Sequence, residues 1–122
     1  MSRLTKASSN QEILATLNET ADAVGEVLRA NKDWSLSGLR DTQYAIDLRA
    51  DAAALEVLTS AGVAVLSEES EITGVFADDG LCVVMDPLDG STNASRGVQW
   101  FATALCAIDK DGMRAGLVVN QA

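Results

Sequence analysis

The stretch from Asp86 to Asn93, Asp-Pro-Leu-Asp-Gly-Ser-Thr-Asn, combines residue types that could bind a divalent metal ion and a phosphate group. Two carboxylates, Asp86 and Asp89, stand three residues apart, and hydroxyl and amide side chains follow at positions 91–93. Carboxylate oxygens are ligands that Mg²⁺ prefers, and backbone N–H groups at a helix start attract anions. The same residue types are also the commonest turn formers, so the stretch taken alone is more often a plain turn.

The sequence before this stretch predicts how it is positioned. The apolar run 81–85 (Leu-Cys-Val-Val-Met) leads directly into it and is typical of a buried strand. We expect the strand to end at Asp86-Pro87, because the proline ring fixes φ and removes a ladder N–H. Gly90 permits a tight bend, after which a helix could start. Both carboxylates are therefore expected on a rigid turn at a strand end.

Length and composition limit the classes of protein that fit. The 122 residues, 48% of them hydrophobic, suffice for one globular domain with a real core. A net charge of −9 disfavours a nucleic-acid partner, which needs clustered Lys and Arg, and is compatible with recruiting Mg²⁺. No apolar run is long enough for a membrane span, and the first residues lack the apolar core of a secretory signal. These features predict a cytoplasmic protein that does not bind membranes.

The side chains that are missing restrict the chemistry further. The chain contains no histidine, which excludes a histidine base, a Ser-His-Asp triad and a His-ligated zinc site within it. Its two cysteines, Cys82 and Cys106, lie in apolar runs and are expected to be small buried hydrophobes rather than a disulfide. Any chemistry must therefore use carboxylates, hydroxyl groups and bound metal.

Helical periodicity marks two segments in the N-terminal half. Residues 9–30 repeat apolar side chains at helical spacing after a possible capping box, either Ser8 with Gln11 or Ser9 with Glu12. Asp47 precedes a second helical pattern that ends near Gly62, so its position favours a helix N-cap over a catalytic role. Residues 41–46 between the helices are ambiguous and could form a weak strand or an extended loop.

The C-terminal half has the pattern of strands. A short buried strand at 63–66 runs into Glu68-Glu69, a second acidic cluster after a strand end that is usually a solvated loop. Residues 72–77 could form another strand, and residues 101–108 and 113–119 read as a hairpin around the turn at 109–112. The order of elements predicts an α+β fold in which two N-terminal helices pack on one face of a mostly antiparallel sheet.

Together these residues resemble the inositol monophosphatase family, which belongs to the Mg²⁺-dependent, lithium-sensitive sugar phosphatases. The resemblance rests on Glu68-Glu69, the 86–93 string, the aromatic-containing strand at 101–108 and the hairpin that ends at Asn120, with Asp47 after Asp41 as further support. It covers nearly the whole chain and implies that residues 1–122 form one metal-binding domain, the N-terminal half of the layered αβαβα sugar-phosphatase fold.

The resemblance also implies a site. Glu68, Asp86 and the backbone carbonyl of Leu88 would hold one Mg²⁺, and Asp86 would bridge to a second ion that Asp89 also binds. The catalytic residues implied are Glu68, Asp47 and Ser91, the last two orienting a water molecule that attacks the phosphate. The substrate would be bound by five consecutive residues: Leu88, Asp89, Gly90, Ser91 and Thr92. Glu69 is only a candidate for an outer position.

The implied reaction is hydrolysis of a small phosphomonoester, inositol phosphate or a related sugar phosphate, by metal-activated water.

The sequence also departs from the family pattern. Ser67 stands where family members often have glycine, and Ser91 stands where many have threonine. Family members carry about as much chain again, with a Trp-Asp motif that has no counterpart here. This chain could therefore be inactive without a C-terminal half, and a family-type homodimer could lack its surfaces. The alternatives are a non-catalytic metal-binding or interaction module and an unrelated α+β domain with acidic turns.

Overall fold

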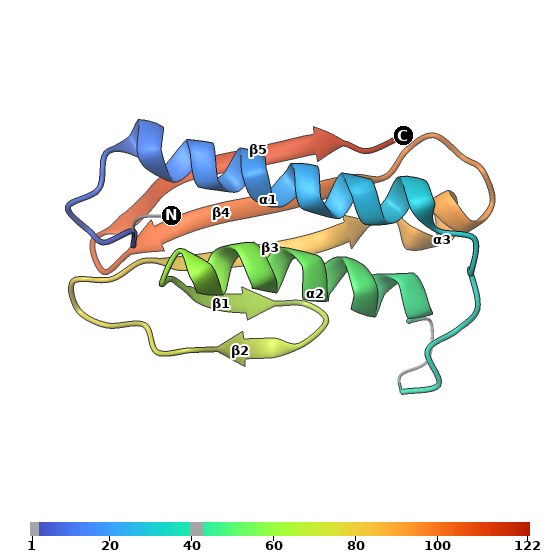
Figure 1. Ribbon diagram of the computed structural model, residues 1–122, viewed down its shortest axis with the longest axis horizontal. Helices are drawn as coiled ribbons and strands as arrows, with labels where there is room; N and C mark the ends of the chain where they lie inside the picture. The colour runs from blue at the N-terminus through green and yellow to red at the C-terminus, as the bar shows by residue number, and fades with distance from the viewer. Residues whose placement is uncertain (1–2, 40–42) are drawn as a thin grey trace.

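The computed structural model describes residues 3–39 and 43–122, and within them the chain forms three helices and a five-stranded sheet (Figure 1). The strands lie in the order β2-β1-β3-β4-β5. Their bounds and those of the helices are α1 Asn10–Ala30, α2 Ala45–Ser60, β1 Ala64–Ser67, β2 Glu71–Thr73, β3 Cys82–Asp89, α3 Ser91–Ser95, β4 Ala102–Asp109 and β5 Gly112–Asn120.

Helix α1 follows the predicted boundaries. Of the two possible capping boxes the chain uses the second, in which the Glu12 N–H donates to Ser9 Oγ (3.1 Å) and the Ser9 N–H donates to Glu12 Oε1 (3.0 Å). These two bonds satisfy backbone donors that the first turn would otherwise leave unpaired. Asn31 ends the helix, as expected.

Helix α2 begins three residues earlier than predicted, with its N-cap at position 44 instead of 47, and this corrects the structural role of Asp47. Tyr44 is the N-cap, and Asp47 is the third helical residue, whose Oδ2 accepts a hydrogen bond from the Tyr44 N–H (2.8 Å). A carboxylate at the third helical position can accept the backbone N–H of the N-cap residue, as the acidic side chain of a capping box does. Before the helix, Tyr44 pairs with Leu36 in an isolated bridge, and the predicted extended positions 41 and 42 lie outside the described residues.

The sheet is mostly antiparallel, as predicted. Only β1 and β3 run parallel, whereas β1 with β2, β3 with β4, and β4 with β5 are antiparallel. The predicted hairpin is confirmed as β4 and β5. Strand β2 covers Glu71–Thr73 rather than the expected 72–77, because the chain turns away at Gly74, whose φ is +79°.

Strand β3 does not end at Asp86-Pro87, which corrects a second prediction. Pairing with β4 continues to Asp89, with a register shift between Asp86 and Asp89. The two pairs that flank the shift join Asp86 to Ala104 and Asp89 to Ala102, so two residues of β3 face the single residue Thr103. The irregular pairing accommodates Pro87, which has no N–H to donate, without ending the strand.

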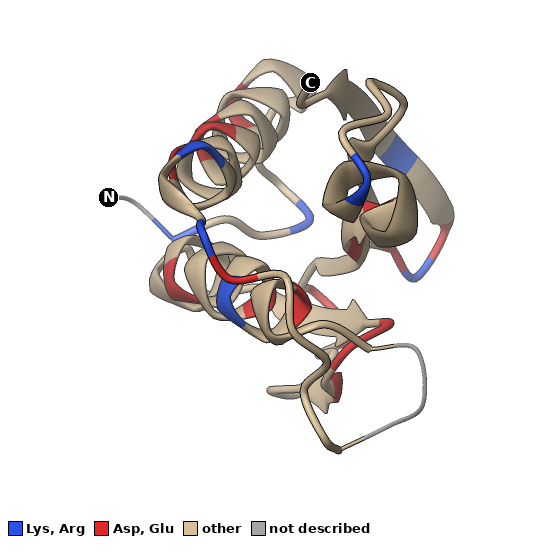
Figure 2. Cartoon of the chain, turned by 90° about the vertical axis from the view of Figure 1, so that its right-hand side faces the viewer, with Lys and Arg blue, Asp and Glu red and all other residues tan. Residues whose placement is uncertain are grey.

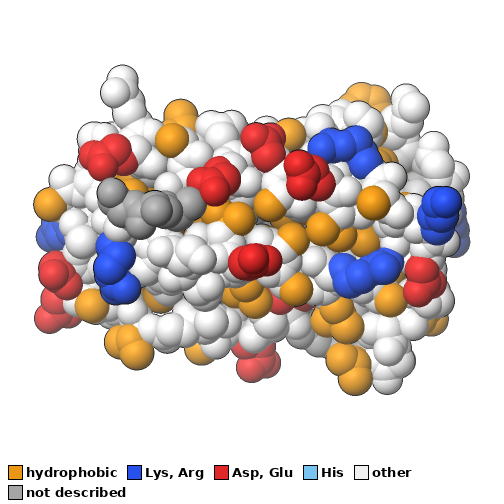
Figure 3. All heavy atoms as spheres, in the orientation of Figure 1, with side chains coloured by type: hydrophobic (Ala, Val, Ile, Leu, Met, Phe, Trp, Pro, Cys, Tyr) orange, Lys and Arg blue, Asp and Glu red, His pale blue; other side chains and the backbone are white. Residues whose placement is uncertain are grey.

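Both long helices cover the same face of the sheet (Figures 1 and 2). The core lies between these layers. It is built from the apolar stripe of α1, from the alanines of α2 together with Ile46 and Leu58, and from the inward side chains of the central strands. The outward face of the helices carries Asp, Glu, Lys and Arg scattered among apolar groups (Figure 3). Within the described ranges no helix has the length and apolar character to cross a membrane.

The opposite face of the sheet has a different character, because apolar side chains on it remain exposed. Leu66 of β1, Val84 of β3 and Val118 of β5 are 44%, 39% and 73% exposed, respectively. They line a broad depression over the strands that reaches Glu68 and Asp86 at one end. This open apolar face therefore adjoins the acidic cluster described next.

Candidate metal and phosphate site

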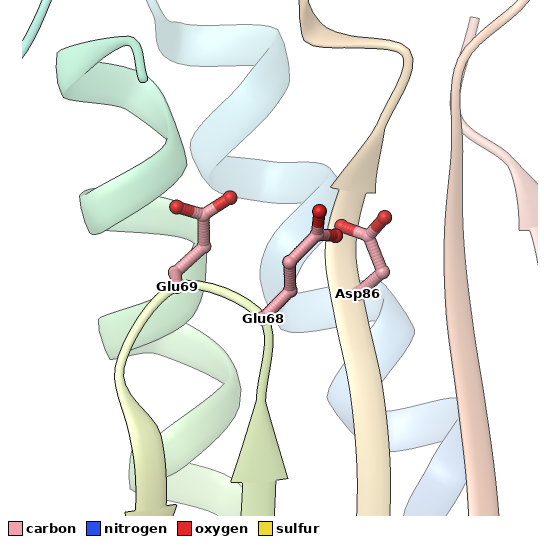
Figure 4. A group of neighbouring side chains, drawn as sticks. All are labelled: Glu68, Glu69 and Asp86. Atoms are coloured by element: carbon pink, nitrogen blue, oxygen red, sulfur yellow. The ribbon is translucent and has the colours of Figure 1, made fainter. Parts of the chain in front are cut away.

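Three carboxylates, those of Glu68, Glu69 and Asp86, meet at one edge of the sheet (Figure 4). One oxygen from each lies within 4.8 Å of the others. They meet because β1 and β3 are parallel neighbours, with Ser67 paired to Met85, so that the residues after β1 lie beside Asp86. The Glu68 N–H donates to the Met85 carbonyl (3.2 Å) and continues this pairing into the turn. Glu69, expected only in an outer position, therefore belongs to the cluster itself.

The cluster strongly disfavours the charged form of Asp86. Burial, a hydrogen bond with Glu68 and the negative charges of Glu68, Asp89 and Glu69 all raise the pKa of Asp86, to about 8. Asp86 Oδ1 is buried and has no hydrogen-bond partner among the residues described. Like charges packed this closely disfavour ionisation unless a cation is bound between them.

Asp47 lies close to the same cluster from the first turn of α2 and is only 2% exposed. Burial raises the pKa of Asp47 to about 6, the Tyr44 N–H and the Ser91 hydroxyl oppose this rise, and the charges of Glu69 and Glu68 add to it. Its Oδ1 is buried and, within the described ranges, without a hydrogen-bond partner. The structure therefore brings Asp47 and Ser91 together, although 44 positions separate them in the sequence.

The remaining predicted residues lie at the end of β3 and in the bend and short helix that follow it. The Leu88 side chain is buried, whereas Asp89 is exposed and lies outside the three-carboxylate group, although its charge acts on Asp86. Gly90, with φ +90°, is the N-cap of α3, and Ser91 and Thr92 are its first two residues. The expected bend and helix start are thus confirmed, and they place two hydroxyl side chains at the beginning of α3.

Several side chains that support the site were not identified from the sequence. Gln43 donates to Glu69 Oε2, and the buried Ser67 hydroxyl donates to the buried carboxylate of Asp51 while it accepts the Glu69 N–H (3.1 Å). No local pattern marks Gln43 or Asp51, which lie before and within α2. The substitution of Ser67 for a frequent family glycine was a usable signal, because a hydroxyl group there needs a partner.

The donor set fits a hard divalent cation. The clustered donors are carboxylate oxygens, the ligands that Mg²⁺ selects, and Asp86 and Asp47 each keep a buried carboxylate oxygen that no other described residue satisfies. Native structures leave few such polar atoms unpaired, so the two oxygens favour a bound partner at this edge. Figure 4 shows the carboxylates of Glu68 and Asp86 facing each other.

Comparison with known proteins agrees with this fold. The sequence profile of the inositol monophosphatase family matches residues 9–121. A fructose-1,6-bisphosphatase/inositol-1-monophosphatase of Archaeoglobus fulgidus is 40% identical over 70 residues, which are 57% of this chain and 27% of the relative. The chain belongs to the inositol monophosphatase family.

Solved structures agree as well. The extragenic suppressor protein suhB of Bartonella henselae aligns with a TM-score of 0.72 at 25% identity over 90% of this chain and 45% of that protein. Inositol monophosphatase from Anabaena aligns with a TM-score of 0.69 at 27% identity over 91% of this chain and 40% of that protein. The chain thus spans less than half the length of each of these relatives, and its fold corresponds to one part of theirs.

Proposed function

We propose that this chain supplies the metal- and phosphate-binding part of a Mg²⁺-dependent phosphomonoesterase that acts on inositol phosphate or a related sugar phosphate. The observation that carries the proposal is the cluster of Glu68, Glu69 and Asp86, in which one buried oxygen of Asp86 has no hydrogen-bond partner among the described residues. Family membership supports the reaction class, since relatives bear the names inositol monophosphatase and fructose-1,6-bisphosphatase. A cytoplasmic location and a homodimer remain predictions.

One metal ion would be held by Glu68, Asp86 and the Leu88 carbonyl. Asp89 would bind a second ion, and Glu69 would add negative charge beside the first. When bound, Mg²⁺ would neutralise phosphate charge and lower the pKa of a water molecule. The side chains themselves would contribute chiefly by positioning, because phosphoryl transfer depends on alignment and charge stabilisation.

Asp47 and Ser91 would handle the proton of the attacking water. A carboxylate whose pKa is raised to about 6 is a stronger base than an ordinary aspartate and still ionises near neutral pH. The Tyr44 N–H holds Asp47 Oδ2, so Asp47 Oδ1 would accept that proton after Ser91 Oγ has oriented the water. The N–H groups of Gly90, Ser91 and Thr92 would donate to the phosphate oxygens.

The first experiment is to measure phosphate release from inositol 1-phosphate and fructose 1,6-bisphosphate with and without Mg²⁺. Asp86→Asn is the test variant, and Asp22→Asn, an exposed change on α1, is the matched control. We expect Mg²⁺-dependent release that falls by about 10²–10³-fold in Asp86→Asn, a loss comparable to that of one charge-stabilising group, and is kept in Asp22→Asn.

Metal binding is measured in parallel, because the chain spans less than half of its relatives' length. Mg²⁺ binding that depends on Asp86, without phosphate release, would support the site and show that the chemistry needs residues outside this chain. Equal Mg²⁺ affinity in the wild type and in Asp86→Asn would contradict the proposal.

A further inference from the structure

A chain of hydrogen bonds, one buried and two partly buried, links helix α1 to the irregular part of β3. Thr103, which is fully buried in β4, donates from Oγ1 to the Pro87 carbonyl (2.8 Å). Gln121 Nε2 donates to Thr103 Oγ1 (3.0 Å) and to the Ala21 carbonyl of α1 (2.9 Å). The linked groups therefore run from Ala21 through Gln121 and Thr103 to Pro87.

The direction of each bond is set by chemistry. An amide NH₂ only donates, so Thr103 Oγ1 must accept from Gln121, and its single proton is left for the Pro87 carbonyl. The reverse orientation of the Gln121 amide would place its oxygen against the Ala21 carbonyl, which offers no proton. Gly25 provides the necessary room, because a Cβ there would lie 2.9 Å from Gln121 Oε1.

The hydrogen bond to Pro87 acts where the sheet gives least support. Thr103 is the one residue of β4 that faces the register shift between Asp86 and Asp89, where regular ladder pairing is interrupted. Pro87 lies between Asp86 and Leu88, which supply a carboxylate and a carbonyl to the proposed metal site. Holding the Pro87 carbonyl restricts the rotation of the peptide units on either side of it, and thereby the direction of both ligand groups.

We propose that Thr103 and Gln121 are positioning residues that set the geometry of the metal ligands on β3, although neither touches the site. This inference rests on the proposed metal site. These hydrogen bonds fix the position of the Pro87 peptide relative to α1. Removing them should weaken metal binding by the folded protein, in addition to any effect on stability.

The test measures Mn²⁺ affinity by electron paramagnetic resonance, together with urea unfolding, for three variants of the 122-residue chain. Thr103→Val keeps the shape of the side chain and removes the hydroxyl group, and we expect its Mn²⁺ dissociation constant to rise about tenfold, as for loss of an outer-layer partner of a metal ligand. Thr103→Ser keeps the hydroxyl group and should bind within about twofold of wild type on the same reasoning.

Gln121→Glu tests the same chain of hydrogen bonds without changing Thr103. A carboxylate accepts where the amide donated, so the Thr103 proton turns toward Glu and leaves the Pro87 carbonyl without its donor. An added negative charge alone would strengthen cation binding, so weaker Mn²⁺ binding by this variant under conditions in which it is folded would come from altered ligand geometry and not from charge. We expect its affinity to fall in parallel with that of Thr103→Val.

The outcomes separate this inference from the proposed function. Wild-type binding that depends on Asp86, with Thr103→Val and Gln121→Glu unchanged in affinity, would overturn the positioning role and leave the metal site standing. Lower stability with unchanged affinity would do the same, since that is the signature of a merely structural hydrogen bond. No Mn²⁺ binding by the wild type would overturn the metal site and, with it, this inference.

Discussion

At the residue scale, the most consequential feature is a carboxylate held in surroundings that resist its ionisation. Asp86 lies beside Glu68 and Glu69, and burial together with these charges raises its pKa to about 8. An aspartate in such a place costs stability when the cation it would bind is absent. The site therefore has a measurable effect on the folding of this chain.

The pKa of Asp86 predicts the pH dependence of the metal-free chain. An unfolded aspartate loses its proton near pH ~3.9, whereas folded Asp86 keeps it to about pH 8. Between these values the native state binds more protons than the unfolded state, so the free energy of unfolding falls as pH rises. Asp47, with its pKa raised to about 6, adds the same sign at lower pH.

Urea unfolding near pH 5 and near pH 8, without divalent ions, measures this slope. We expect Asp86→Asn to flatten the slope, while Asp22→Asn, which makes the same change in net charge, leaves it nearly intact. Metal affinity should instead increase as pH rises, by about tenfold per pH unit below the pKa of Asp86, because metal binding displaces the proton from that carboxyl group. A stability that rises with pH would contradict the burial of Asp86.

A second residue-scale prediction concerns Ser67. Ser67→Ala removes the donor to buried Asp51 and the acceptor for the Glu69 N–H, and we expect it to destabilise the chain by about 1–3 kcal/mol because both groups lose their partner. Ser60→Ala is the control, since the exposed Ser60 hydroxyl only donates to the Glu56 carbonyl of its own helix. A double-mutant cycle with Asp51→Ala should show coupling of about 1 kcal/mol or more; additive effects would argue against the contact.

At the element scale, the site depends on how β3 passes into α3. Gly90 adopts φ +90°, and a Cβ at this position would lie 2.8 Å from the Trp100 carbonyl oxygen. Asn93 from α3 donates to that same carbonyl (3.0 Å). The transition from β3 to α3 is therefore packed closely against the chain that precedes β4.

This packing makes Gly90 intolerant of substitution. We expect Gly90→Ala to cost about 2–4 kcal/mol, combining the strain of positive φ with a backbone contact that must give way. Gly97→Ala isolates the first of these effects, because Gly97 also has positive φ (+72°) but a Cβ there would meet no atom within 4 Å; we expect about 1 kcal/mol. Equal losses in chemical denaturation would show that the close approach to Trp100 is unimportant.

At the scale of the whole molecule, the two faces of the sheet differ in how well the described chain covers them. The helices cover one face of the sheet (Figure 2), while apolar side chains on the other face remain exposed in the described chain. Each of the solved relatives compared above is more than twice as long as the part this chain matches. An exposed apolar face of this kind favours association.

We therefore expect the isolated chain to self-associate as its concentration rises and to bind a hydrophobic dye. Replacing Val84 and Val118 by threonine should lower both effects, since both side chains lie on the open face, 39% and 73% exposed. Val75→Thr is the control, because Val75 is 86% exposed but lies outside that face, after β2. Sedimentation velocity and dye fluorescence give the readout; a double variant that behaves as the wild type would rule this face out as the cause.

The sequence by itself determined features that depend on neighbouring residues. The capping box of α1, the two helices, the β4–β5 hairpin and the bend at Gly90 follow from residue types a few positions apart, because hydrogen bonds and φ preferences there are local. Family resemblance supplied the association of Glu68 with Asp86, because their spacing alone would also suit two solvated turns.

Only the tertiary structure decided which side chains meet. Glu69 joins the acidic cluster because β1 lies parallel to β3, and Thr103 supports Pro87 because β4 pairs across a register shift. The earlier start of α2 and the continuation of β3 past its proline depend likewise on the Tyr44–Asp47 contact and on the strand opposite. Contacts between residues far apart in the chain are set by strand order and pairing, which no local pattern specifies.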